Sequence, residues 1–301
     1  GYDLLLQDGL AHAALFAANP GIRKRLRRPV VSIVHHLFCC EPGQSPLLAP
    51  LRRRVERRYL RTADALVCAS SHAAECSGQL LSRLPRHVVA PPGADHACPE
   101  LSPEEISRRS SEPGPLRLLF VGQVTPRKGL LPTLHCLAQI PEKHWELHVA
   151  GNDGLDLGYS RRIRRFLQER GLQDKVRLWG RVGDGQLRRL YRESHLLCMP
   201  FAYEGYGIVF LEAMAAGLPV LAKQDCGARE VVTHGENGFL FSPSDVSGPA
   251  TQIRELAGDR ERLLDMGLAA RQAYLRHPSW ETSMSRVESF LADLSRENPD
   301  E

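Results

Sequence analysis

Residues 199–220 read MPFAYEGYGIVFLEAMAAGLPV and carry the strongest structural signal in the chain. An apolar run ends at Pro200, a glycine-containing loop follows, and an apolar stretch over residues 208–216 stops at Gly217. This order predicts a buried strand, a loop and a buried helix. The helix contains one charged residue, Glu212. Because an unpaired buried carboxylate is strongly disfavoured, we expect Glu212 to have hydrogen-bond donors, from the protein or from a polyhydroxylated ligand.

The loop before this helix has the composition of an anion-binding turn. Gly205 and Gly207 allow backbone N–H groups to face outward at the helix start, where the helix dipole favours an anion such as phosphate. Glu204 lies in the loop beside that position. A glycine-containing loop alone is a weak indication of a phosphate site. A structural role for Glu212, bonded to backbone or to an arginine, also stays open.

Short apolar runs alternate with helical patterns along the whole chain, which is typical of parallel α/β architecture. The first part has strand candidates at residues 3–7, 30–35, 65–69 and 87–90, and expected helices at 9–19, 46–62 and 71–83. The second part has strand candidates at 116–121, 146–150, 176–179, 196–199, 220–222 and 238–241. Its expected helices are 129–139, 159–169, 184–193, 208–216, 228–233 and 246–256, followed by an amphipathic pattern over 259–294.

The segment 98–115 is polar and contains four prolines, so we place a domain boundary there. Residues 1–112 are predicted to form one Rossmann-like domain, and residues 113–301 a complete nucleotide-binding domain with C-terminal helices. At roughly 30 residues per β/α unit, the first domain is two to three units short of its partner. The chain also starts at Gly1 rather than at Met, so we expect the N-terminal domain to be incomplete in this sequence.

Composition excludes several classes of protein. With 301 residues, 43% hydrophobic and 25% charged, the chain can bury a sizeable core and is neither disordered nor fibrous. No apolar run approaches the roughly 20 residues that a membrane helix needs. The eight cysteines include no C-x-x-C pair and give no zinc or disulfide pattern. A reducing, cytoplasmic location is therefore expected.

Positive charge is concentrated in the first part of the chain. Residues 1–86 hold 13 Lys and Arg against 6 Asp and Glu. The densest stretch, Leu51–Arg61, has apolar residues at helical spacing and arginines on the other faces, which predicts an amphipathic surface helix. It is either a solvated helix face or a site for anionic membrane lipid or an acidic substrate. Nucleic acid is disfavoured, because no aromatic platform or zinc-finger spacing accompanies the charge.

The pattern E-G-Y-G-x-x-x-x-E-A-M-A-x-G-x-P-V, starting at Glu204, resembles the paired-glutamate motif of the family 4 glycosyltransferases, which are retaining enzymes of the GT-B fold. The resemblance extends over nearly the whole chain. Its further motifs are Phe120-Val121-Gly122 with Pro126-Arg127-Lys128-Gly129, Val149-Ala150-Gly151, Gly180, residues 226–230 with Asn237-Gly238, and the histidine-bearing strand at residues 29–35. The resemblance implies a GT-B fold with two Rossmann-like domains facing across a cleft.

The resemblance also implies a role for each matched residue. Glu212 would hold the ribose hydroxyls and Glu204 the hydroxyls of the donor sugar. Arg127 and Lys128 would neutralise the diphosphate in place of a metal ion, and His35 would approach the sugar. The implied catalytic residues are His35, Arg127, Lys128 and Glu204, and the implied donor-binding residues are Gly122, Gln123, Gly151, Gly205, Tyr206, Gly207, Ile208, Val209 and Glu212. A solvated turn at residues 127–128 and a plain surface histidine at residue 35 are the alternatives, and His36 competes for the role of His35.

The implied reaction moves a sugar from a UDP- or GDP-linked donor to an acceptor hydroxyl, by front-face substitution without metal or other cofactor. The acceptor would be a carbohydrate or a lipid-linked molecule, which would place the protein in the cytoplasm, peripheral to the membrane. Two departures from the family pattern stand out: Gln123 replaces an arginine, and the family's first strand with its Gly-Gly loop has no counterpart. A non-catalytic nucleotide-sugar-binding module is therefore the alternative. An epimerase of the same fold fits the paired glutamates less well.

Overall fold

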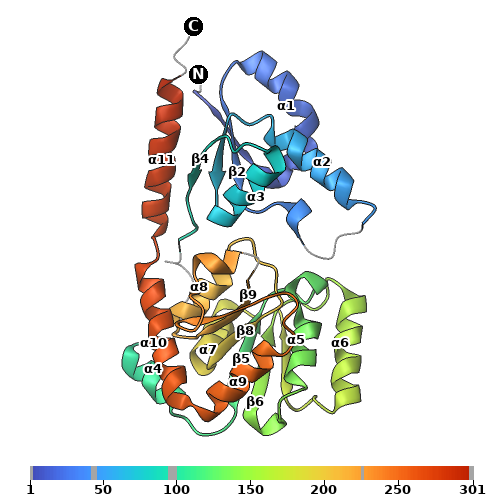
Figure 1. The fold of residues 1–301 in the computed structure, drawn as a ribbon, viewed down its shortest axis with the longest axis vertical. Coiled ribbons are helices and arrows are strands. Elements are labelled where there is room, and N and C mark those ends of the chain that lie inside the picture. Colours follow the sequence, from blue (N-terminus) through green and yellow to red (C-terminus); the bar gives the residue numbers. More distant parts are fainter. Residues whose placement is uncertain (1–2, 42–45, 94–99, 225–226, 298–301) are drawn as a thin grey trace. The chain divides into compact units, whose positions relative to one another are not determined.

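The computed structural model describes residues 3–41, 46–93, 100–224 and 227–297. The chain forms two compact units, one made of Gly1–Asp95 and Pro278–Glu301, the other of His96–His277. Each unit contains a parallel sheet with helices, as the alternating pattern predicts (Figure 1). Cys98 and Cys226, and with Cys226 the start of the motif at 226–230, lie outside the described residues.

The first unit has, within the described residues, a four-stranded sheet in the order β1-β2-β3-β4. All its strand pairs are parallel, with Leu5 opposite Val30 and Val31 opposite Ala65. The strands are β1 (Leu5–Asp8), β2 (Val30–Val34), β3 (Ala65–Cys68) and β4 (Arg86–Val89), and the helices between them are α1 (His12–Leu26), α2 (Ala49–Leu60) and α3 (Ser71–Leu81). β2 and β3 are almost continuously apolar because they are buried on both faces.

The second unit has, in the part of the chain that is described, a six-stranded parallel sheet in the order β10-β9-β8-β5-β6-β7. Its strands are β5 (Leu116–Val121), β6 (Trp145–Ala150), β7 (Val176–Gly180), β8 (Leu196–Met199), β9 (Val220–Lys223) and β10 (Gly238–Phe241). Its helices are α4 (Pro103–Ser110), α5 (Leu130–Leu137), α6 (Leu157–Arg170), α7 (Asp184–Glu193), α8 (Ile208–Ala215), α9 (Gly248–Gly258) and α10 (Arg260–Arg276). Every predicted strand is present. The helix expected at 228–233 is instead a short 3-10 turn at Gly227–Glu230.

The predicted second domain, residues 113–301, differs from the second unit of the structure at both of its ends. Helix α4 belongs to the second unit, because Ile106 is fully buried there and its Cδ1 fills the space beside Gly217, where a Cβ would lie 2.4 Å away. The amphipathic pattern over 259–294 is two helices, with Pro278 between them. The later one, α11 (Trp280–Arg296), runs along β4 in the first unit (Figure 1), and its Leu294 joins the core cluster around Val31.

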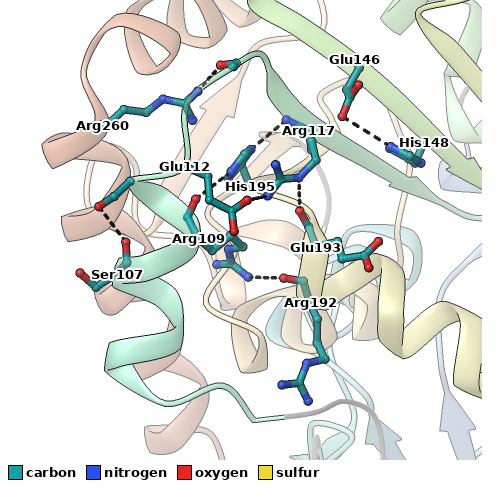
Figure 2. A network of polar contacts seen from close by, with 12 residues as sticks. Ser107, Arg109, Glu112, Arg117, Glu146, His148, Arg192, Glu193, His195 and Arg260 are labelled. Carbon is teal, nitrogen blue, oxygen red and sulfur yellow. Dashed lines mark hydrogen bonds and ion pairs between the residues drawn. The ribbon is translucent and has the colours of Figure 1, made fainter.

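A polar network joins α4 to the amino ends of β5 and β8 (Figure 2). The buried Arg109 guanidinium donates hydrogen bonds to the carbonyls of Ala216 and Gly217, at 2.8 and 2.7 Å, directly after α8. These carbonyls have no partner within the helix, so the cation caps its carboxyl end. The network therefore fixes one end of α8.

The buried His195 is the centre of the same network. Its Nδ1 accepts a hydrogen bond from the N–H of Arg117 at 2.9 Å, and its Nε2 lies 3.0 Å from the carbonyl of Arg109 and donates to it. Burial, and then the charges of Arg117 and Arg260, lower the pKa of His195 from 6.5 to about 3. The imidazole is therefore neutral at physiological pH, which its role as an acceptor requires.

Candidate functional site

The glycines that follow β5 and β6 bring two strand ends into direct contact. Gly122 donates its N–H to the carbonyl of Ala150 at 2.9 Å, and Gly151 donates to the carbonyl of Gly180 at 2.9 Å. A Cβ at Gly151 would lie 1.8 Å from the carbonyl oxygen of Gly122. Only glycine allows this approach, so the structure brings the predicted Gly122 and Gly151 together. The neighbouring Gln123 is exposed.

The basic turn after β5 packs against the loop after β8. Gly129 has a φ of +70°, and a Cβ there would lie 2.7 Å from the carbonyl oxygen of Phe201. This close approach places Lys128 beside Glu204, and the ammonium and the carboxylate form an ion pair. Their side chains are 11% and 13% exposed. The alternative of a solvated turn is therefore wrong for Lys128.

Arg127 is held by the same loop. Its Nη1 donates to the carbonyl of Tyr203 at 3.4 Å, and the N–H of Tyr203 donates to the carbonyl of Arg127 at 3.0 Å. Two predicted cations and one predicted carboxylate thus meet at the carboxyl edge of the second sheet.

Glu212 lies on α8, half-buried, with a donor that the sequence did not reveal. The hydroxyl of Tyr191, on α7, donates to Oε2 of Glu212 at 2.7 Å. Burial raises the pKa of Glu212, and the Tyr191 hydrogen bond opposes that shift in part. One hydrogen bond uses only part of the acceptor capacity of a carboxylate, which has about four lone-pair positions. The predicted need for a protein donor is therefore met, with capacity left for ligand hydroxyls.

The amino end of α8 begins in the glycine loop. Gly207 has a φ of +97°, and a Cβ there would lie 2.3 Å from the ring of Phe210. The helix is buried along most of its length, yet the side chain of its first residue, Ile208, is 44% exposed, and Val209 is partly exposed. The start of α8 is thus the accessible end of a buried helix.

Tyr206 and Gly205 fix the loop through contacts with His277 and Gly227. The Tyr206 side chain is buried, and its hydroxyl lies 3.3 Å from Nε2 of His277. The carbonyl of Glu204 accepts a hydrogen bond from the N–H of Gly227 at 3.0 Å, and a Cβ at Gly227 would lie 2.4 Å from the carbonyl oxygen of Gly205. The buried side chain of Tyr206 therefore packs inside the second unit and supports the loop.

His35 belongs to the first unit, directly after β2. Its Nε2 lies 3.4 Å from Oδ1 of Asp8, which ends the neighbouring β1, and its side chain is 45% exposed. The next residue, His36, turns to a different partner, with Nε2 3.2 Å from a carboxylate oxygen of Glu41. The two histidines face different carboxylates, although both lie beyond β2, which ends at Val34 and not at His35 as predicted. Asp8 was not predicted, because only the register of β1 beside β2 places it there.

Comparisons with known proteins identify the family of the chain. Residues 102–273 match the sequence model of the family described as Glycosyl transferases group 1. GDP-mannose-dependent alpha-(1-6)-phosphatidylinositol monomannoside mannosyltransferase of Mycobacterium tuberculosis is 29% identical over 272 residues, which cover 83% of this chain and 67% of that protein. D-inositol 3-phosphate glycosyltransferase of Nocardia farcinica is 28% identical over 289 residues, which cover 90% of this chain and 63% of that protein. The chain thus spans about two thirds of the length of these relatives.

Solved structures share the fold. Sucrose-phosphate synthase from Thermosynechococcus elongatus superposes with a TM-score of 0.80 at 24% identity, covering 99% of this chain and 75% of that one. Anabaena HepE in complex with UDP-glucose superposes with a TM-score of 0.79 at 22% identity, covering 97% of this chain and 79% of that one. The predicted GT-B fold class is therefore confirmed.

Proposed function

Because the chain belongs to the group 1 glycosyl transferases, we propose that it transfers a sugar from a UDP- or GDP-linked donor to an acceptor hydroxyl and retains the anomeric configuration. The observation that carries this proposal lies at the carboxyl edge of the second sheet. There the buried pair of Lys128 and Glu204 lies in the loops that precede α8, and α8 carries Glu212. Cations and the amides at a helix start bind the diphosphate of such a donor, and carboxylates bind the hydroxyls of its ribose and its sugar.

Each group has a separate task in donor binding. The lone pairs of the Glu212 carboxylate that Tyr191 does not use accept hydrogen bonds from the ribose hydroxyls, while Tyr191 holds the carboxylate in place. The amides at the start of α8, near Gly207 and Ile208, bind phosphate. Arg127 and Lys128 neutralise the diphosphate, and Glu204 binds hydroxyls of the sugar to be transferred.

The transfer step breaks the bond between the anomeric carbon and the leaving phosphate while the acceptor oxygen attacks from the same face. The leaving phosphate oxygen takes the acceptor proton, so no enzyme nucleophile is needed. Arg127 and Lys128 stabilise the charge that develops on that phosphate, which removes the need for a divalent ion. Turnover should therefore survive excess EDTA. Loss of turnover that magnesium or manganese restores would contradict this part of the proposal.

The donor site is tested by Glu212→Ala. A hydrogen bond to a charged group contributes about 1.5–3 kcal/mol, so donor affinity should fall by about tenfold to a hundredfold. Calorimetry with UDP- and GDP-linked sugars measures the loss and identifies the nucleotide. The matched control is Glu169→Ala, which removes an exposed glutamate paired with Arg165 on α6. Unchanged affinity in a folded Glu212→Ala protein would refute the ribose role, and donor binding without turnover would favour a nucleotide-sugar-binding module.

We further propose a lipid-linked acceptor and peripheral contact with the cytoplasmic face of a membrane, through α2 and the residues before it. The buried side of α2 carries Glu56, Tyr59 and Leu60, and its exposed side carries arginines. Those arginines are Arg52, Arg53, Arg54 and Arg58. Beside them, the side chains of Leu47, Leu48 and Leu51 are 89%, 47% and 59% exposed. Leu51 therefore does not join the buried face that its spacing predicted.

Exposed leucines beside arginines fit the boundary between lipid head groups and acyl chains. Each arginine near an anionic surface contributes about 1 kcal/mol, and this attraction is screened by salt. No helix in the described part of the chain is long and apolar enough to cross a bilayer. The proposed contact is therefore one at the membrane surface.

Co-sedimentation with phosphatidylcholine vesicles, with and without phosphatidylglycerol, tests this surface. Binding should require phosphatidylglycerol and fall steeply with salt. Replacing the four exposed arginines of α2 by Gln, or the three exposed leucines by Ser, should abolish it. The matched control replaces four exposed arginines of α6, which are Arg161, Arg162, Arg164 and Arg165. No binding at low salt, or equal loss in the control, would refute the membrane contact.

A further inference from the structure

Three cysteines from two separate segments of the first unit pack against one buried cluster that includes residues of α2. Cys39 and Cys40 end a short 3-10 turn, Phe38–Cys40, which follows β2, and Cys76 lies on α3. The turn is held in place by Glu56, whose buried carboxylate accepts the N–H groups of Phe38 and Cys39, both at 2.7 Å. The hydrogen bonds to Glu56 therefore fix the position of the turn that carries Cys39 and Cys40.

The side chains of Cys39, Cys40 and Cys76 all pack against the same buried cluster, which includes Tyr59 and Leu80, and the thiols of Cys39 and Cys76 lie near enough to Cys40 to lower its pKa. Sγ of Cys76 lies 3.6 Å from Nε2 of His72, one turn earlier on α3. The three cysteines are only partly buried, whereas Cys68, Cys136 and Cys198 are fully buried.

The three thiols differ in how readily they ionise. Contacts with Cys39 and Cys76, followed by the charges of His72 and Arg53, lower the pKa of Cys40 against the effect of burial. The contact with Cys40 raises the pKa of Cys76, and burial and Glu75 act in the same direction. The same contact, burial and Glu56 raise the pKa of Cys39. Cys40 therefore has the most thiolate character of the three, and the thiolate is the reactive form.

We propose that Cys40 and Cys76 form a reversible disulfide pair that responds to a peroxide. The Cys40 thiolate attacks one peroxide oxygen, the O–O bond breaks, and the departing hydroxide takes up a proton to leave as water. This step gives a sulfenic acid at Cys40. Cys76 then loses its proton to His72 and attacks the Cys40 sulfur, and the S–O bond breaks with release of a second water. The two thiols lose two electrons, and the peroxide gains them.

The new bond would join the turn after β2 to α3. It would thereby restrain the segment that follows His35. The thiol chemistry itself does not depend on sugar transfer, so it is tested on the whole chain by covalent readouts alone.

The test treats the folded protein with hydrogen peroxide, blocks remaining thiols and maps the products by peptide mass spectrometry. We expect a Cys40–Cys76 cross-link that dithiothreitol removes, and about tenfold faster alkylation of Cys40 at neutral pH than of an ordinary thiol. Cys76→Ser should stop at the sulfenic acid, which dimedone traps at Cys40. Cys40→Ser should abolish both products, and the control Cys68→Ser should change neither.

Circular dichroism of each variant shows whether a change in reactivity comes from the lost thiol or from a lost fold. In Cys76→Ser, Cys40 is still present, so its sulfenic acid can be trapped with dimedone. A bond between Cys39 and Cys40, an unreactive Cys40, or cross-linking that persists in Cys40→Ser would overturn the proposal.

Discussion

Lys128 and Glu204 form an ion pair with each other, and both are needed for donor binding in the proposed mechanism. Their side chains are almost buried, so each charge depends on the other for its compensation. A diphosphate that arrives at Lys128 must therefore share the ammonium with Glu204. The pair therefore makes stability and donor binding depend on the same residues.

The variant Lys128→Met separates these two effects. Removing one partner of a buried ion pair costs about 3–5 kcal/mol, because the other charge stays buried without compensation. Lys128→Met with Glu204→Leu removes both charges and should regain much of that stability. Donor affinity should stay low in both proteins. Urea unfolding and calorimetry measure the two quantities, and full recovery of donor binding in the double variant would refute the role of Lys128.

The neutral His195 predicts how stability depends on pH. Its pKa is about 3 in the folded protein and near 6.5 in the unfolded chain, so the unfolded chain binds more protons between these values. The stability that the neutral imidazole contributes is therefore complete above pH 6.5 and is lost as the pH falls toward 3. Each pH unit in that window costs up to about 1.4 kcal/mol.

Urea unfolding from pH 7 to pH 4 checks this prediction. The variant His195→Gln should be less stable than the parent at pH 7 but should lose less stability on acidification. The exposed His87 provides the control, since His87→Gln should leave the pH dependence as it is. An unchanged slope in His195→Gln would contradict the buried neutral state.

At the scale of secondary-structure elements, the ends of the strands matter more for the site than their middles. Gly122 and Gly151 allow β5 and β6 to end in direct backbone contact. Gly129 and Gly207 similarly bring the neighbouring loops close to Phe201 and Phe210. Glycines at these positions therefore allow the close backbone packing that positions the charged residues of the site.

Gly151→Ala should therefore disturb the site through the backbone. The added Cβ would meet the Gly122 carbonyl at 1.8 Å, so the two strand ends must separate. Overpacking of this kind costs about 1–3 kcal/mol or more, and donor affinity should fall with it. The matched control is Gly185→Ala on α7, where a Cβ meets nothing within 4 Å. Thermal unfolding and calorimetry check both variants, and equal behaviour of the two would show that the contact is unimportant.

The elements were largely predictable from the sequence, whereas the contacts between them were not. Buried parallel strands such as β8 are continuous apolar runs, and turn residues bound them, so their positions follow from local sequence. The Tyr191–Glu212 hydrogen bond and the network of His195 join residues from separate elements. They depend on how helices pack against the sheet, and no local pattern encodes that. The short 3-10 turn at Gly227–Glu230 likewise depends on the close approach of Gly227 to the loop after β8.

At the scale of the whole molecule, the chain does not divide at one point. The polar, proline-containing segment that suggested a boundary includes α4, and α4 is attached to the second unit through Ile106 and Arg109. The amphipathic pattern of α11 predicts one apolar face, but it does not say which sheet that face will cover. Only the structure shows that it covers the first.

This division predicts which fragments fold. Residues 100–277 contain the second unit with α4, so this fragment should unfold cooperatively and should bind a nucleoside diphosphate with the affinity measured for the whole chain. Residues 113–301 lack Ile106 and Arg109 and carry α11 without its sheet, so this fragment should be less stable and tend to associate. Thermal unfolding, calorimetry and light scattering distinguish them. Equal stability and solubility of the two fragments would contradict the division.

The placement of α11 also sets an order of events during synthesis on the ribosome. Val31 and Ala65 leave the exit tunnel early, but Leu294, which packs against them, is translated only after the entire second unit. The first sheet must therefore wait in the growing chain with an apolar face uncovered, a state that invites chaperones or association with other nascent chains. The second unit meets no such delay, because its residues are contiguous. It can be complete while the first unit still lacks its final helix.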